Sequence, residues 1–168
     1  MLTIEKVAIL RAVPIFANVP DDVLASVAQI MEEVNLAAGE VFIQEGALED
    51  CMYLVVEGEV RVFSQGNTII VLGSNQAVGE LAVLDPEPRS ASVSAVGPVM
   101  LFRIDKTPFD EVMADRPELA SGVIRALCRR VRDQGRLMAE QAKNDAAGAP
   151  GTTNGSAVAM GNGLRAGQ

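Results

Sequence analysis

The feature that most constrains the fold is a series of short apolar segments separated by glycines, which fills residues 39–103. The segments read GEVFIQEG, CMYLVVEGEVRVFSQGN, TIIVLG and SASVSAVGPVMLFRI. Short apolar runs that end at turn residues are typical of β-strands. Many such strands at near-regular spacing favour a sandwich or barrel over a parallel α/β sheet. The loose alternation of Leu54 and Val56 with Val55 and Glu57 predicts strands that are packed on one face.

Helical periodicity precedes the strands, within residues 1–35. One apolar set recurs at every third position: Ile4, Val7, Leu10 and Val13. A second set, after a turn at residues 18–20, recurs at intervals of three and four: Val23, Leu24, Val27, Ile30 and Met31. Such spacing places apolar side chains on one face of a helix, so two N-terminal helices are predicted.

Helical periodicity returns after the strands, within residues 107–143. A short helix from Pro108 is predicted to stop before Arg116 and Pro117, because the residue before a proline is pushed out of the α region. A longer helix follows, with a heptad-like seam: Ala120, Ile124, Leu127, Val131, Gln134, Met138 and Gln141. A seam of this kind has to pack on the β region, on a second copy of the chain, or on both. A homodimer through the helix 118–143 is therefore one of our predictions.

These patterns together predict an α+β, mainly β protein. Its centre is an antiparallel β-roll, jelly-roll-like, over residues 36–106, with N-terminal helices before it and two C-terminal helices after it, the last one long. Residues 1–143 form one domain in this interpretation. Residues 144–168 are mostly small and carry too little apolar bulk to offset the entropy of ordering them, so we predict a disordered tail.

The composition excludes several kinds of chemistry. The chain contains no histidine, which rules out Ser-His and Cys-His nucleophile systems and any His-ligated metal. No carboxylates cluster at metal-binding spacing, so we expect neither a metal nor an enzyme. The net charge of −8 argues against a surface that neutralises nucleic-acid phosphates. Three arginines within residues 128–132 are interpreted as the exposed face of a helix, because no aromatic or further basic residues accompany them.

The sequence also bears on location and on further domains. No run approaches the roughly 20 apolar residues that a membrane span needs, and the start lacks the basic-then-apolar order of a secretory signal. We therefore expect a cytoplasmic protein, with Cys51 and Cys128 as reduced, buried thiols. Residues 144–168 are too few for a helix-turn-helix, so no DNA-binding domain is expected.

The stretch VGELAVLDPEPRSASV, residues 78–93, combines the groups expected of an anion site. Gly79 leads into a predicted helical turn, whose free N–H groups favour an anion. Arg89 offers a planar guanidinium that can bind two phosphate oxygens, and Ser90 adds a hydroxyl donor. Glu80 is a poor neighbour for a phosphate but a good acceptor for a ribose hydroxyl.

A plainer interpretation of the same residues stays open. Glu80 would then be a solvated turn residue, and Arg89 would form a surface ion pair with Glu87, worth at most about 1 kcal/mol.

The order of these residues resembles the phosphate-binding cassette of cyclic nucleotide-binding domains, here residues 78–91. This family includes the catabolite activator protein, the regulatory subunits of cyclic-AMP-dependent kinase and cyclic-nucleotide-gated channels. The resemblance rests on Gly79-Glu80-Leu81-Ala82, six intervening residues, and Arg89-Ser90-Ala91 before a strand, and it extends over roughly residues 2–134.

The resemblance implies a role for each cassette residue. Glu80 would bind the ribose 2′-hydroxyl and Arg89 the cyclic phosphate. Ser90 and the amides of three residues would complete the phosphate shell: Leu81, Ala82 and Ala91. Further candidates around the ligand are Val71, Val78, Arg130 and Gln134. Threonine after the cassette arginine often accompanies cyclic GMP preference in the family, so Ser90 favours cyclic AMP without excluding cyclic GMP.

Two functions of different kinds follow. In the first, the chain is a stand-alone regulatory module that binds cyclic AMP and signals through movement of its last helix to a partner protein or a second subunit. In the second, it is a ligand-free interaction or dimerisation module with the same fold.

Overall fold

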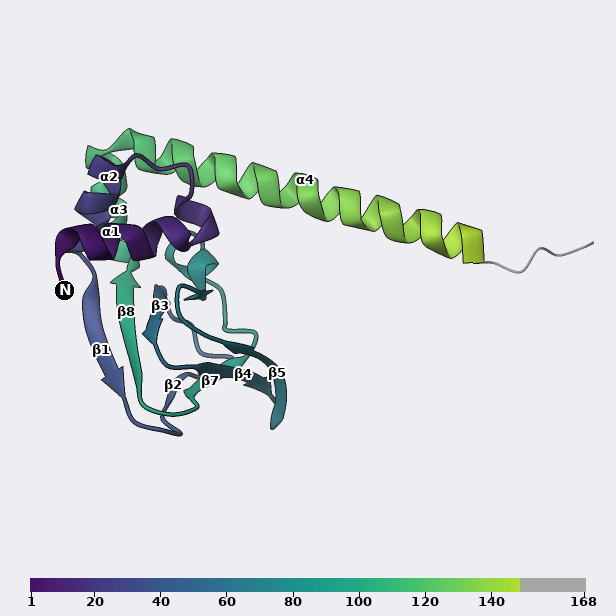
Figure 1. Cartoon of the computed structure of the whole chain (residues 1–168), viewed down its shortest axis with the longest axis horizontal. Helices are drawn as coiled ribbons and strands as arrows, with labels where there is room; N and C mark the ends of the chain where they lie inside the picture. Colours follow the sequence, from purple (N-terminus) through teal and green to yellow (C-terminus); the bar gives the residue numbers. More distant parts are fainter. Residues whose placement is uncertain (149–168) are drawn as a thin grey trace, which may run out of the picture. The chain divides into compact units, whose positions relative to one another are not determined.

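The structure is a computed structural model that describes residues 1–148, and it confirms the predicted β-roll. Its strands form two four-stranded antiparallel sheets with the orders β1-β8-β3-β6 and β2-β7-β4-β5 (Figure 1). The strand bounds are β1 Glu32–Leu36, β2 Val41–Ile43, β3 Cys51–Glu57, β4 Val60–Ser64, β5 Asn67–Leu72, β6 Ala77–Val78, β7 Ser92–Ala95 and β8 Val99–Asp105.

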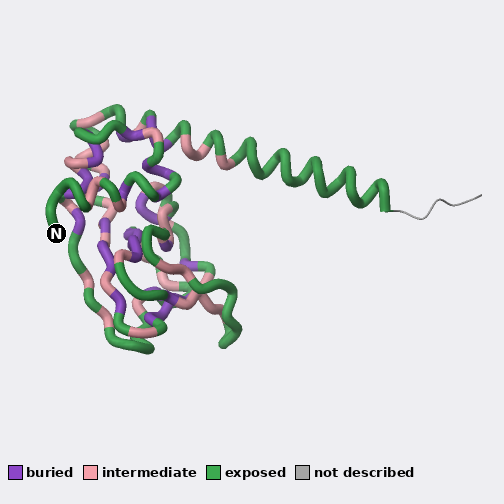
Figure 2. Tube along the Cα trace, viewed as in Figure 1, coloured by how far each residue is buried: buried purple, intermediate pink, exposed green. Residues whose placement is uncertain are grey.

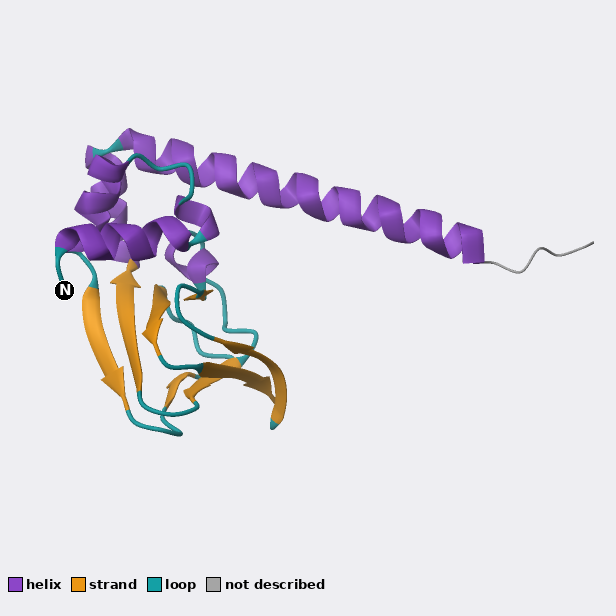
Figure 3. Cartoon of the chain, in the orientation of Figure 1, coloured by secondary structure: helices purple, strands orange, loops and turns teal. Residues whose placement is uncertain are grey.

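Helices precede and follow the strands, as the periodicity predicts (Figure 3). Their bounds are α1 Thr3–Ala12, the 3-10 helix η1 Pro14–Phe16, α2 Asp21–Gln29, the 3-10 helix η2 Glu80–Val83, α3 Lys106–Asp115 and α4 Pro117–Gly148. The short η2 lies between β6 and β7 and forms the first part of the cassette.

Two boundaries differ from the sequence prediction. The first strand begins at Glu32, inside the segment 1–35 expected to be helical, because residues 32–36 pair in register with β8. The last helix continues to Gly148 instead of ending near Lys143. Ala146 and Ala147 lie in this added turn, and alanine has the highest helix propensity. The rest of the predicted tail, residues 149–168, lies outside the described residues.

The strands β3 and β8 are buried on both faces, which corrects the expectation of one packed face. Alternate side chains of β3, Met52 and Leu54, pack with the helices, while Tyr53 and Val55 pack with the second sheet. Figure 2 colours most of both strands as buried. A strand enclosed in this way reads as a continuous apolar run, as in CMYLVV. The protein thus has two apolar clusters that share one sheet.

The chain divides into two compact units, Met1–Val131 and the part from Arg132 onward. The first unit includes the start of α4, where Leu119, Gly122 and Val123 are buried. A β-carbon on Gly122 would come within 2.6 Å of the Val19 side chain, so glycine permits close packing of α4 on the loop before α2. Cys51 is buried as expected, but Cys128 is exposed. Within residues 1–148, no helix combines the length and apolar character needed to cross a bilayer.

Candidate functional site

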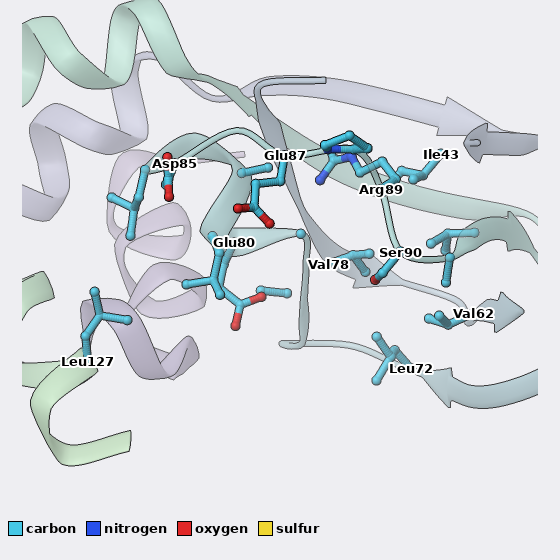
Figure 4. A pocket seen from close by; sticks show the side chains of 18 residues that line it. Ile43, Val62, Leu72, Val78, Glu80, Asp85, Glu87, Arg89, Ser90 and Leu127 are labelled. Atoms are coloured by element: carbon cyan, nitrogen blue, oxygen red, sulfur yellow. The ribbon is translucent and has the colours of Figure 1, made fainter. Parts of the chain in front are cut away.

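An open cavity of about 640 Å³ lies beside the cassette, in the first unit (Figure 4). Its apolar lining includes side chains from both sheets and one residue of α4: Ile43, Val62, Leu72, Ala77, Val78, Val93 and Leu127. Its polar lining comes from the cassette: Glu80, Asp85, Glu87, Arg89 and Ser90. A mostly apolar cavity of this size with a few convergent polar groups suits a small organic ligand.

Gly79 determines how the cassette begins. It has a φ of 69°, in the left-handed region that favours glycine, and it is the N-cap of η2. A β-carbon at this position would also clash with Nη1 of Arg89. Backbone conformation and space therefore both require glycine here.

Arg89 is held at the wall of the cavity by its backbone and by its side chain. Its amide donates to Ala47 O at 2.9 Å, and its carbonyl accepts from the amide of Gly46 at 2.8 Å. Its guanidinium donates from Nη2 to Cys51 O at 2.6 Å and from Nε to Glu49 at 3.3 Å. The side chain is only 7% exposed. The surface ion pair with Glu87 is therefore wrong for this residue.

Among the described residues, the buried guanidinium of Arg89 has no bidentate carboxylate partner. Its contact with Glu49 uses Nε alone and is long, whereas a bidentate carboxylate would satisfy the planar fork. Nearby, burial raises the pKa of Tyr53 well above its ordinary value, and the adjacent Cys51 raises it further, so the phenol stays neutral. Because a buried cation is costly without a well-placed counter-charge, a ligand phosphate next to Arg89 would be stabilised.

Glu80 lines the same cavity and is paired with Arg130 of α4. The distance from Glu80 Oε1 to Arg130 Nη2 is 2.8 Å, and both side chains are partly exposed, 24% and 33% respectively. A carboxylate has acceptor capacity on two oxygens, so one Arg130 contact leaves capacity for a hydroxyl. The pair also joins the cassette to the last helix within the first unit.

The remaining candidates divide between the cavity and other places. Val78, Leu81, Ala82, Ser90 and Ala91 line the cavity. The amide of Ala82 already donates to Gly79 O at 3.0 Å, so it is engaged within the turn.

Two of the further candidates, Val71 and Arg130, are absent from the cavity lining. Leu72, the neighbour of Val71, does line the cavity, since successive side chains of a strand point to opposite faces. Gln134 belongs to the second unit, and its place relative to the cavity is not described.

The sequence interpretation missed Glu49 and Cys51, which hold Arg89. They stand about 40 positions before it in the chain, and nothing in EGALEDCMY singles them out. The bridge between Leu48 and Pro88 and the backbone bonds of Arg89 to Gly46 and Ala47 bring them together. Among residues 1–148 no group of histidine, cysteine or acidic side chains is arranged to hold a metal ion.

Comparison with known proteins identifies relatives of this chain in sequence and in fold. The family model for the cyclic nucleotide-binding domain matches residues 33–116. The chain is 27% identical over 145 residues to a CRP-like cAMP-activated global transcriptional regulator of Mycobacterium tuberculosis, which covers 83% of this chain and 65% of that protein. It is 33% identical over 112 residues to a cyclic nucleotide-gated potassium channel of Mesorhizobium japonicum, which covers 67% of this chain and 31% of the channel.

Solved structures give the same picture. The N-terminal domain of a transcriptional regulator from Streptomyces coelicolor A3(2) superposes with a TM-score of 0.72 at 33% identity, over 77% of this chain and 93% of that one. The regulatory domain of Toxoplasma gondii PKA, solved with cAMP, superposes with a TM-score of 0.61 at 29% identity, over 66% of this chain and 44% of that one.

The chain spans less than two thirds of the length of the curated relatives described here, 65% of one and 31% of the other. The family match nevertheless includes both sheets except Glu32, the complete cassette and α3. On this evidence, the chain belongs to the cyclic nucleotide-binding domain family.

Proposed function

We propose that this chain is a regulatory module that binds a cyclic purine nucleotide, with cyclic AMP preferred, and that it is not an enzyme. The observation that carries the proposal is that Arg89 and Glu80 line one cavity from the same short cassette. The cassette thus offers a permanent cation for a phosphate and a carboxylate for a hydroxyl. The M. tuberculosis relative is named as cAMP-activated and the T. gondii domain was solved with cAMP, which supports this choice of ligand.

Each part of the nucleotide has a counterpart in the cavity. Arg89 and Ser90 would bind the cyclic phosphate, and Glu80 would accept from the ribose 2′-hydroxyl. The purine would lie against apolar lining such as Val62, Leu72 and Leu127. Ser90 in place of threonine favours cyclic AMP, and cyclic GMP stays as the comparison ligand.

The signal would pass from the cassette to α4. Glu80 is held by Arg130 and would also hold the ligand, so the ligand and the helix share one carboxylate. A ligand that strengthens or weakens this pair shifts the equilibrium between two positions of α4. The size of the shift equals the difference in the free energy of ligand binding to the two forms, and the position of α4 affects ligand affinity to the same extent. We propose that residues 1–143 act as this module.

A second candidate function, the interaction or homodimerisation module, is favoured by one observation. Large apolar side chains of α4 are exposed: Ile124, Val131, Leu137 and Met138. Three of them, Ile124, Val131 and Met138, recur every seventh residue, which is typical of a coiled-coil seam. Light scattering at several concentrations, with Ile124→Asp and Val131→Asp variants, tests it; a protein that stays monomeric at all concentrations excludes the dimer.

Isothermal titration with cyclic AMP and then cyclic GMP tests the first candidate. Arg89→Ala should weaken cyclic AMP binding at least tenfold, or about 1.4 kcal/mol. Arg61→Ala is the matched control, because Arg61 is bonded only to its own hairpin through Thr68 and Gly66 and does not line the cavity.

Two results would contradict the proposal. The first is an affinity that Arg89→Ala leaves unchanged. The second is the absence of binding heat with both nucleotides in folded protein, which would place the interaction module first.

A further inference from the structure

Lys106 connects the far end of the cassette turn to α3. It is the first residue of α3, and its side chain is 27% exposed. The ammonium donates to Val83 O at 3.4 Å, to Leu84 O at 3.3 Å and to Asp110 Oδ1 at 3.2 Å. A lysine ammonium has three donors, so all three have acceptors within the protein.

The two carbonyls are those that a helical turn leaves unsatisfied at its C-terminal end. Such carbonyls carry partial negative charge, and a cation next to them is stabilising. The turn itself has few bonds of its own, among them Leu84 N–H to Leu81 O at 3.0 Å and Asp85 N–H to Leu81 O at 2.8 Å. Lys106 therefore adds side-chain contacts at the C-terminal end of a turn that is otherwise held by its own backbone bonds and by the buried Val83.

The backbone of the same residue reaches the other half of the site. The amide of Lys106 donates to Asp50 O at 2.9 Å. Asp50 precedes Cys51, whose carbonyl holds the guanidinium of Arg89. One residue is thus bonded to the turn that carries Glu80 and to the strand end that anchors Arg89.

We infer that Lys106 is a positioning residue of the nucleotide site, one that fixes the spacing between the Glu80 turn and the Arg89 anchor without lining the cavity itself. The predicted effect of Lys106 on nucleotide affinity rests on the proposed function. Its effect on the turn itself can be measured without any ligand. The backbone bond to Asp50 remains in any side-chain variant, so a variant loses the side-chain contacts alone.

The test compares Lys106→Met with Lys6→Met. Lys6 is also partly buried, donates to Ala28 O at 3.5 Å and lies over the Phe102 ring, but it touches no part of the cassette. Lys106→Met should weaken cyclic AMP binding about tenfold, whereas Lys6→Met should leave it unchanged. Asp110→Asn, which removes the ion pair and keeps both carbonyl contacts, should have a smaller effect in the same direction; it also serves if Lys106→Met does not fold.

Amide hydrogen exchange of the ligand-free protein provides the second measurement. Lys106→Met should speed exchange at residues 82–85 and leave β3 and β8 protected, whereas Lys6→Met should leave residues 82–85 as in the wild type. Unchanged exchange at these amides overturns the inference, and so does unchanged affinity in a protein that binds cyclic AMP. If the wild type binds no cyclic nucleotide, the proposed function fails, and faster exchange still assigns Lys106 its role in holding the turn.

Discussion

Two charged residues of the cavity, Arg89 and Glu80, are held in opposite ways. Arg89 is buried and bonded to the β-roll by its amide, its carbonyl and its guanidinium. Glu80 is partly exposed and its side chain pairs with Arg130 of α4 through a single ion pair. A group held by many bonds to a rigid sheet is suited to binding, because little ordering is left to lose. A group held by one exposed bond to a helix can be rearranged at low cost, which suits transmission.

Replacing Gly79 should displace the rigidly held Arg89 and have the largest effect on nucleotide affinity. Gly79→Ala places a β-carbon against Arg89 and a non-glycine residue in the left-handed region, at about 1–2 kcal/mol for the backbone alone. We expect cyclic AMP affinity, measured by titration calorimetry, to fall about a hundredfold, or about 2.7 kcal/mol.

Gly39→Ala is the control for this prediction. Gly39 has a φ of +83° and no atom within 4 Å of the new β-carbon, so it carries the backbone cost without the clash. Equal losses of affinity in the two variants would show that the contact with Arg89 is unimportant.

Removing the partner of the partly exposed Glu80 should have a moderate effect on nucleotide affinity. Arg130→Met removes the partner that orients Glu80, and an ion pair this exposed is worth up to about 1 kcal/mol. We expect cyclic AMP binding to weaken by up to about fivefold. In a double-mutant cycle with Glu80→Gln, the two losses should be less than additive, because both act through the same carboxylate. Fully additive losses of affinity would show that Arg130 does not act on ligand binding through Glu80.

A third arginine, Arg116, serves as a reference for Arg89 and Arg130, because its ion pair with Asp22 lies away from the cavity. The hydrogen bond from Arg116 holds the pKa of Asp22 below its ordinary value of 3.8. A lowered pKa stabilises the folded state above the unfolded value, and this stabilisation is lost as the pH falls through the folded value.

Asp22→Asn should therefore lower the Tm at pH 7 slightly, by less than about 2 °C, without changing nucleotide affinity. The difference from the wild type should shrink as the pH falls below about 4. Thermal unfolding at a series of pH values measures it, and a difference that grows toward low pH would contradict the assignment.

The strand β3 shows how far the sequence prediction reached and where it stopped. Glycine spacing predicted that a strand lies there, since local turn chemistry ends strands. The continuous run CMYLVV also carried the signal of burial on both faces, which the loose alternation obscured. What encloses β3 is set by α1, α2 and the second sheet, which are distant in the chain.

The sequence by itself determined the order of elements, the cassette and the ligand chemistry that its residues suit. These follow from local patterns: glycine at turns, apolar spacing on strands and helices, and Glu80 and Arg89 nine positions apart in the chain. Tertiary structure alone decided that Arg89 is buried against Glu49 and Cys51, that Glu80 meets Arg130, and that Lys106 holds the cassette turn. Each of these contacts joins segments far apart in the chain, and only the packing of two sheets and the last helix brings such segments within hydrogen-bond distance.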